Sequence, residues 1–206
     1  MSNALRKKLA VVMVRLLPAR IARRFVRHEK GAAAVEFALV AIPFLALLFA
    51  ILETALVFFA GQVLEAATAE ASRLILTGQA QTTNYTTGAA STTGYSADDF
   101  KNAVCDHVYG LFSCANIYVS VTNYSTFGSV DTTTMPVTNG KFDSSKLKYD
   151  LGGPNCIESV AVYYEWPIYV SLLGNNLASN GLGNGSRLLV ATSVFRVEPY
   201  GTNACS

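Results

Sequence analysis

Few residues in this chain have types and spacings that could do chemistry. Two carboxylates, Glu36 and Glu53, interrupt a long run of uncharged residues. A carboxylate deep in an apolar membrane helix costs about 2.5–3.5 kcal/mol, and less near the helix ends. All four cysteines lie beyond that run, at Cys105, Cys114, Cys156 and Cys205. The first feature indicates a special role inside a membrane, and the second indicates disulfide chemistry outside the cytoplasm.

Other candidate groups favour structural roles. Asp98-Asp99 could be an acid/base pair, but acidic residues at a helix start are favoured by the helix dipole. Asp106-His107 has no accompanying nucleophile motif and is interpreted as a surface pair on a helix. The chain has only two histidines and no C-x-x-C pair, which argues against a zinc site. We therefore expect no catalytic residue, no metal site, no cofactor and no small-molecule substrate.

The cysteines allow three disulfide connectivities. We favour Cys105–Cys114, which closes a short loop, and Cys156–Cys205, which ties down the carboxyl terminus. Free buried thiols are the alternative.

Charge is distributed unevenly along the chain. Residues 1–30 contain nine Lys/Arg and one acid, whereas the remaining residues contain seven basic and thirteen acidic side chains. Basic flanks of membrane helices stay in the cytoplasm, so this asymmetry predicts a cytoplasmic N-terminus and an external C-terminal part. The basic run leads straight into an apolar segment, and we therefore expect no nucleic-acid partner.

The apolar segment is long enough to cross a membrane once. Phe37 to Leu52 carry no charge, and a bilayer core needs about 20 apolar residues. The apolar core of a cleavable secretory signal is shorter, at about 7–15 residues. Glu36 on its own could sit at the cytoplasmic edge and reach water, and Glu53, roughly 25 Å further along a helix, could do so at the opposite face. Pro43 removes one helix hydrogen bond and is expected to loosen or kink the span.

The helix is predicted to continue outside the membrane to residue 77, for a total of near 70 Å, roughly 1.5 Å per residue. Thr77-Gly78 indicates its end, because glycine suits the left-handed cap position. An apolar stripe marks this outer part, formed by Val63, Leu64, Ala67, Ala71, Leu74 and Ile75.

The remaining residues predict an α+β head with an antiparallel sheet packed on helix. Residues 78–97 are expected to be a polar linker, and Ser96 with Asp99 predicts a capping box that opens a helix near Ala97–Phe112. Three runs are strand-like, namely Asn116–Asn123, Ile157–Ser171 and Ser186–Val197, with an edge or a break at Pro167. Residues 122–145 and 174–185 are expected to be loops. An aromatic cluster is predicted to serve the core or an interface, namely Tyr163, Tyr164, Trp166 and Tyr169.

The residues around Gly31 resemble a prepilin processing site. Lys30 and Gly31 are followed by apolar residues, with Glu36 at the fifth position after the glycine and Phe37 at the sixth. Together with Pro43, Glu53 and the sequence RLILTGQ, this stretch resembles the TadE-like pilus assembly proteins of the tight-adherence (Tad, Flp-type) pilus system. The resemblance covers residues 23–79 and extends more weakly through 100–121, 160–167 and 187–200.

The resemblance implies a set of roles and partners. A prepilin peptidase would cut between Gly31 and Ala32, so that residues 1–31 are a cytoplasmic leader, 32–77 a transmembrane and stalk helix, and 98–206 an extracytoplasmic head. Glu36 and Phe37 would serve subunit assembly. The transmembrane part would include Phe37, Pro43, Leu52 and Glu53. The implied partners are the membrane, the peptidase and other pilus subunits, both the major Flp-type pilin and another minor pilin.

The resemblance implies a minor pilin-like, non-enzymatic protein of the bacterial inner membrane, with its head in the periplasm and, after processing, in the extracellular pilus. Two alternatives stay open at this point. One is an unprocessed bitopic scaffold of the assembly machine, and the other is a membrane-tethered adhesin or enzyme.

Overall fold

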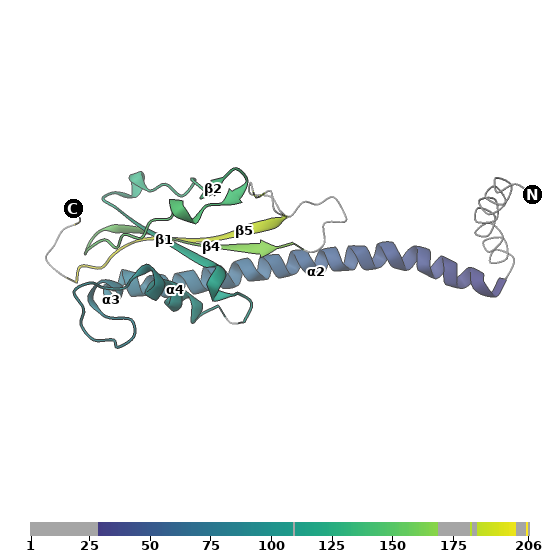
Figure 1. Ribbon diagram of the computed structural model, residues 1–206, viewed down its shortest axis with the longest axis horizontal. Coiled ribbons are helices and arrows are strands. Elements are labelled where there is room, and N and C mark those ends of the chain that lie inside the picture. The colour runs from purple at the N-terminus through teal and green to yellow at the C-terminus, as the bar shows by residue number, and fades with distance from the viewer. Residues whose placement is uncertain (1–28, 109, 169–181, 183–184, 201–204, 206) are drawn as a thin grey trace, which may run out of the picture. The chain divides into compact units, whose positions relative to one another are not determined.

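The computed structural model describes residues 29–108, 110–168, 182, 185–200 and 205. The chain divides into two compact units, Met1–Ala50 and Ile51–Ser206. The described elements follow the order α2 (Glu29–Leu76), α3 (Gln79–Thr82), α4 (Ala97–Cys105), β1 (Ile117–Tyr124), β2 (Val137–Thr138), β3 (Lys141–Phe142), β4 (Ile157–Pro167) and β5 (Ser186–Arg196), with short 3-10 turns between them (Figure 1).

Helix α2 is 48 residues long and includes Pro43 within its helical run. Its end follows the expected chemistry. The N–H of Thr77 donates to the carbonyl of Arg73 at 3.0 Å, and Gly78 takes a left-handed conformation with φ of 79°. Glycine is favoured there because it has no Cβ to clash in that conformation. The predicted helix stop at Thr77-Gly78 is therefore confirmed.

In the second unit, β1, β4 and β5 form an antiparallel sheet in the order β1-β4-β5. One face of this sheet lies along α4 and the carboxyl-terminal part of α2 (Figure 1). Along β1, Ile117, Val119 and Val121 point to this face, and β4 places Tyr164, Val162 and Val160 opposite them. The predicted α+β architecture, an antiparallel sheet on helix, is confirmed.

The other face of the sheet holds a second, smaller core. Tyr118 of β1 and Tyr163 of β4 both pack against Phe142, with ring centroids 4.8 and 5.8 Å away. Phe142 belongs to the β2–β3 hairpin, whose turn residues Asn139 and Gly140 have φ of 51° and 71°. Two successive positive φ values are typical of the tight turns that match strand twist. The segment expected to be a loop over 122–145 therefore contains a hairpin.

Two element lengths differ from expectation. Helix α4 ends at Cys105 rather than at Phe112, and Asp106 forms its C-cap. Val108 is nevertheless buried in the main core, so the chain keeps its contact with the core beyond the end of the helix. Strand β4 ends at Pro167, where the proline N cannot donate to a sheet ladder. The predicted extension to Ser171, the position of Tyr169 and most of loop 174–185 lie outside the described residues.

Residues 78–97, expected to be a linker, are packed within the second unit. The N–H of Tyr95 donates to the carbonyl of Ala80 at 2.7 Å, and that of Ser91 donates to the carbonyl of Thr82 at 2.8 Å. Tyr95 is buried in the main core and meets Tyr85 edge to face. These contacts make the segment a structured loop rather than a free tether. The predicted boundaries of leader, stalk and head stay predictions.

Candidate functional site

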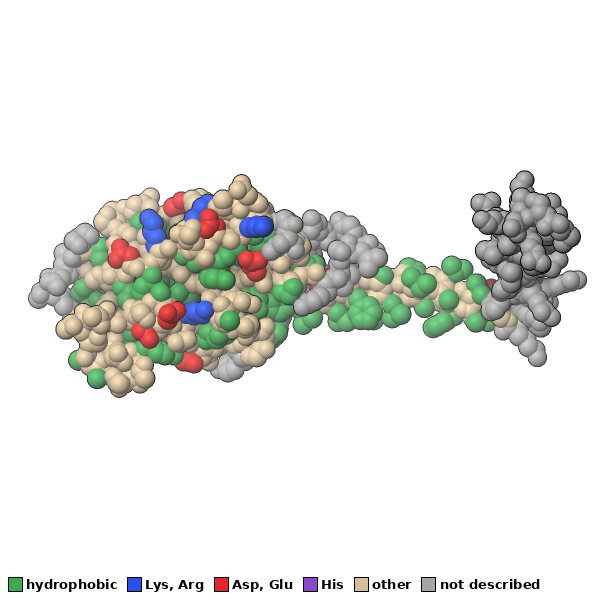
Figure 2. All heavy atoms as spheres, viewed as in Figure 1, with side chains coloured by type: hydrophobic (Ala, Val, Ile, Leu, Met, Phe, Trp, Pro, Cys, Tyr) green, Lys and Arg blue, Asp and Glu red, His purple; other side chains and the backbone are tan. Residues whose placement is uncertain are grey.

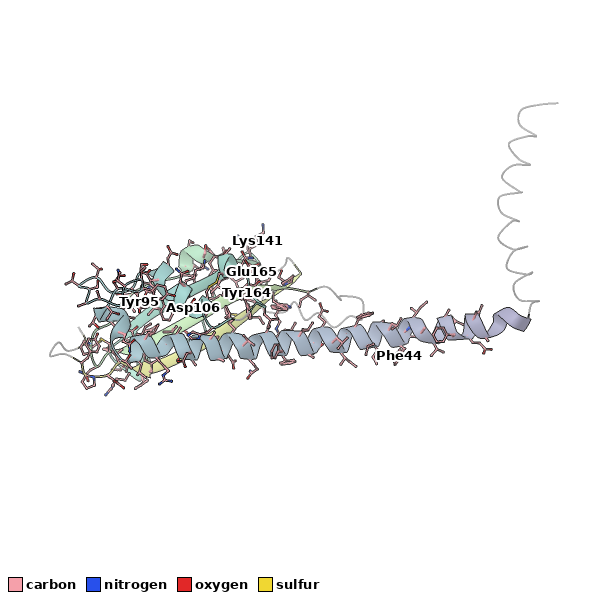
Figure 3. The ribbon with its side chains drawn as sticks, turned by 90° about the horizontal axis from the view of Figure 1, so that it is seen from below. Phe44, Tyr95, Asp106, Lys141, Tyr164 and Glu165 are labelled. Carbon is pink, nitrogen blue, oxygen red and sulfur yellow. A yellow bond between two sulfur atoms is a disulfide. The ribbon has the colours of Figure 1, made fainter. Side chains whose placement is uncertain are left out.

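The feature of α2 that calls for a function is its exposed apolar surface. Large hydrophobic side chains project outward along residues 35–59, as Phe44 does in Figure 3 and the hydrophobic side chains along the helix do in Figure 2. Phe37 is 76% exposed and Phe58 is 69% exposed. Fully burying one such side chain is worth about 1.5–3 kcal/mol, so a surface of this extent requires an apolar environment. By length and composition, α2 is the candidate membrane span within the described part of the chain, with a mean hydropathy of 2.6 in its most apolar window.

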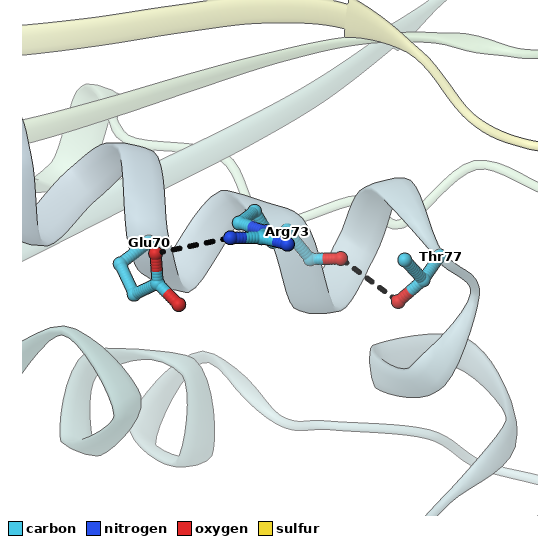
Figure 4. Close-up of polar contacts among 3 residues, drawn as sticks. All are labelled: Glu70, Arg73 and Thr77. Atoms are coloured by element: carbon cyan, nitrogen blue, oxygen red, sulfur yellow. Dashed lines mark hydrogen bonds and ion pairs between the residues drawn. The ribbon is translucent and has the colours of Figure 1, made fainter.

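The character of the exposed surface changes near Gly61. The side chains that face outward beyond this point are mostly polar or small. Gln62 donates to Glu65 at 3.1 Å, and Arg73 pairs with Glu70 at 3.6 Å (Figure 4). Thr77 Oγ1 donates to the carbonyl of Arg73 at 2.9 Å, which satisfies one of the last helical carbonyls. The apolar surface therefore stops where water-compatible contacts begin, as expected at a membrane exit.

The buried side of the same helix also follows a pattern. Apolar residues recur at three- and four-residue spacing and pack against the sheet and α4, namely Val57, Ala60, Leu64, Ala67, Ala71 and Ile75. Such spacing places side chains on one face of a helix. This part of α2 is therefore a core element of the head.

Glu53 begins that buried side. The sequence suggested that its carboxylate reaches water at the far edge of a membrane. Its side chain is only 7% exposed, and it lies four residues before Val57 on the buried face. The structure thus places the Glu53 side chain on the buried side of α2, within the second unit, and not in solvent.

Glu36 has the opposite setting. It is exposed in an apolar stretch, beside Val35 and Phe37, and it is the only charged residue from Gly31 to Leu52. An ionised carboxylate in such surroundings is costly unless it is paired or reaches water. An exposed carboxylate in an apolar surface therefore requires either water or a partner of opposite charge.

The structure also describes the remaining residues of α2 to which the sequence assigned a role. Gly31 and Ala32 lie in the first turn of α2, which begins at Glu29. Pro43 and Leu52 are exposed along the apolar surface.

The cysteines form two disulfides in the second unit. Cys105, at the end of α4, is bonded to Cys114, and their Cα atoms are 5.8 Å apart. Cys156, next to β4, is bonded to Cys205 with Cα atoms 4.8 Å apart. These are the two pairs that the sequence favoured. They join the end of α4 to Cys114 and the residue before β4 to Cys205.

The groups that could suggest catalysis are engaged in structural contacts. Asp99 accepts from the N–H and hydroxyl of Ser96, which confirms the predicted capping box. Asp106 accepts a 2.6 Å hydrogen bond from the hydroxyl of Tyr85, and this bond raises the pKa of Tyr85 to about 12. Hydrogen bonds from Thr134 and Thr133 hold the pKa of Asp131 well below its usual range.

No metal-binding group of His, Cys, Asp or Glu occurs among the described residues. A cavity of about 200 Å³ on the outer sheet face is lined by hydroxyl, lysine and apolar side chains, including Ser120, Thr122 and Lys146. Asp131 is the acidic residue that lines this cavity. Its carboxylate accepts hydrogen bonds from Thr133 and Thr134 of its own loop. The aromatic side chains Tyr164, Trp166 and Phe112 form a packed cluster in the main core.

Together, the fold and the site define a class of protein: one long apolar helix joined to a disulfide-bonded α+β head. More particularly, residues 31–73 match the family model described as TadE-like protein. The match lies within α2 and includes Gly31, Glu36, Pro43 and Glu53, so the resemblance deduced from the sequence is confirmed over this segment. The TadE-like family is a structural, pilus-associated family that is not known as enzymatic. No curated protein and no solved structure matches the chain.

Proposed function

We propose that this chain is a minor pilin-like component of a Tad/Flp pilus assembly system, anchored in the bacterial inner membrane by α2. Residues 1–31 lie in the cytoplasm and the head lies in the periplasm. One observation carries the proposal: a lone exposed carboxylate, Glu36, stands five residues after Gly31 in an apolar helix surface within the TadE-like match.

Glu36 is the assembly residue in this proposal. Cleavage between Gly31 and Ala32 creates a new ammonium group at Ala32, in the same membrane layer as the carboxylate. An ammonium on one subunit and Glu36 on its neighbour compensate each other, because both are costly alone in a low-dielectric layer. Phe37, next to Glu36 and highly exposed, adds apolar contact area to the same subunit interface.

Processing at Gly31 requires local unwinding of α2, because Gly31 and Ala32 are helical. A peptidase requires extended backbone, and glycine leaves a helix more readily than other residues do. The partners in this account are the prepilin peptidase, the major Flp-type pilin and another minor pilin. The head remains outside the membrane, where its disulfides suit an oxidising compartment.

A second candidate function is an unprocessed bitopic scaffold of the assembly machine. The observation in its favour is that helical structure is continuous from Glu29 across Gly31 and Ala32. In this alternative the basic tail stays attached and the helix serves only as an anchor.

Reading the amino terminus separates the two functions. The chain is expressed with its peptidase and the mature terminus is determined by mass spectrometry. We expect a chain that begins at Ala32, and Gly31→Leu should abolish the cut. Gly61→Leu is the matched control, because a Cβ at Gly61 meets open space in the same helix. An intact basic tail in piliated cells would establish the scaffold instead.

Replacing Glu36 by Ala tests the assembly role. We expect cleavage to survive and piliation to fail, because the neighbouring ammonium loses its partner. Glu65→Ala, an exposed carboxylate on the same helix beyond the apolar surface, should leave piliation intact. Normal piliation in the Glu36→Ala strain would remove the inter-subunit role.

A further inference from the structure

The head contains one fully buried carboxyl group that the proposed function does not use. Glu158 is the second residue of β4 and has 0% exposure. The N–H of Gly152 donates to Oε1 of Glu158, but Oε2 has no hydrogen-bond partner. Its register partners, Asn123 on β1 and Phe195 on β5, carry no charge. Burial of an ionised carboxylate is strongly unfavourable when one of its oxygens has no hydrogen-bond partner.

The ionisable groups around Glu158 make its negative charge more costly still. Asp150 is acidic and disfavours a second negative charge nearby. The neutral phenols of Tyr149 and Tyr200 are further ionisable groups that interact electrostatically with Glu158. Among the described residues, no Lys, Arg or His forms an ion pair with Glu158. Burial is the largest cause and Asp150 adds to it, so the pKa of Glu158 is raised to about 7, although the Gly152 N–H opposes the shift.

Glu158 is joined through Gly152 to the end of α2. Gln81 Nε2 donates to the carbonyl of Gly152 at 3.2 Å and to the carbonyl of Ile75 at 3.3 Å. A Cβ at Gly152 would lie 2.8 Å from Cβ of Cys156 and 2.9 Å from Cβ of Asn123, so the backbone passes very close to the sheet. Two further polar atoms of this region, Gln81 Oε1 and Tyr149 Oη, are buried without partners. The contacts around Gly152 thus depend on Glu158 remaining buried without water at its Oε2 atom.

We propose that Glu158 is a proton-binding site that latches residues 149–153 against β4 and the carboxyl-terminal end of α2. With a proton on Oε2, Glu158 is neutral, remains buried and keeps its bond to Gly152. After the proton leaves, the carboxylate draws water into the site and the 149–153 segment loosens from Gln81. The proposal is independent of pilus processing and depends only on the fold of the head.

The direction of the pH dependence follows from linkage. The folded-state pKa of about 7 lies above the ordinary value of 4.5. The latch therefore contributes its full stability below the ordinary value and loses it as the pH rises through about 7.

The test uses the full chain in detergent micelles. Thermal unfolding and hydrogen exchange of residues 149–153 are measured from about pH 5 to about pH 8, with exchange corrected for its intrinsic pH dependence. We expect the wild-type chain to lose several degrees in Tm and most of its protection at Gly152 as the pH rises to about 7, with little further loss above that value. Glu158→Gln, which is neutral at every pH, should show neither loss. Glu198→Gln removes an exposed carboxylate of the same head and should keep the wild-type profile.

A second variant keeps the proposal testable if Glu158→Gln does not fold. Asp150→Asn removes the neighbouring negative charge, so the transition should move to lower pH. Carboxyl ¹³C shifts of glutamate-labelled chain should show one group that titrates near neutrality in the wild type. A flat wild-type profile, an unmoved transition in Asp150→Asn, or an unchanged transition in Glu158→Gln would each overturn the proposal.

Discussion

Two stretches of the same helix present opposite surfaces. In residues 33–59, the apolar stretch, most large hydrophobic side chains are exposed, as Phe37, Ile42 and Phe58 are. In residues 60–76, the head stretch, apolar side chains such as Leu64 and Ile75 are fully buried and the outward positions include Glu65, Glu70 and Arg73. The backbone is α-helical throughout.

The difference teaches that one regular element serves two environments. The head stretch is stabilised by the sheet and α4, so its sequence keeps the 3.6-residue period of an amphipathic helix. The apolar stretch is hydrophobic all round, which is typical of a helix in lipid or among other helices. Around Glu53 and Val57 the two patterns overlap. These two side chains are buried, as in the head stretch, while Leu52 and Leu56 on the other side of the helix are exposed, as in the apolar stretch.

The largest expected effect is in the head stretch. Leu64→Ala removes a fully buried side chain from the main core and should destabilise the head by about 2–5 kcal/mol, because a cavity remains. Thermal unfolding of the full chain in micelles measures it. Phe58→Ala, a larger truncation at an exposed position of the same helix, should change the Tm far less. Equal losses for the two variants would contradict the division of α2 into two stretches.

A charge in the apolar stretch should disturb the membrane rather than the fold. Leu47→Lys places an ammonium near the middle of this stretch, at a cost of about 2.5–3.5 kcal/mol on insertion scales. We expect a smaller fraction of the chain to integrate into the membrane, measured by carbonate extraction. Gln62→Lys adds the same charge beyond the apolar surface and should integrate as the wild type does. Similar behaviour of the two lysine variants would argue against a membrane exit near Gly61.

A smaller loss of stability is expected from a change at the N-terminus of α4, which contributes to the same core as the head stretch. Ser96 caps α4 in a reciprocal box with Asp99, and Ser96→Ala should cost about 0.5–2 kcal/mol. Thr92→Ala, an exposed position in the same loop, is the control. A Tm unchanged by Ser96→Ala would show that α4 contributes little to covering the helix.

The sequence predicted best where local rules decide the structure. The end of α2 at Gly78, the capping box at Ser96 and the start of β5 at Ser186 follow from residue types within a few positions. The buried stripe was predicted only from Val63 onward. Its first residues, Glu53 and Val57, could not be distinguished, because hydrophobic periodicity disappears where every neighbour is apolar.

Other features were hidden for different reasons. The β2–β3 hairpin has a local signal, Asn139-Gly140, which is among the strongest for a two-residue turn, although it stands inside a range whose composition is typical of a loop. Strand alternation places Glu158 on the same face of β4 as Val160 and Val162, but a carboxylate near the start of a strand is expected to reach water. Its contact with Gly152 comes from a segment outside the strand, so the sequence does not predict its complete burial.

The most direct test of the central claim is a cysteine-accessibility profile along α2 in intact cells and in inverted membrane vesicles. The native cysteines are bonded in pairs, so single introduced cysteines report their own positions. A membrane-impermeant thiol reagent should label positions 65, 69 and 73 from the periplasmic side only, and should not label positions 40, 44 and 47 from either side. Labelling of position 44 in intact membranes would contradict the account.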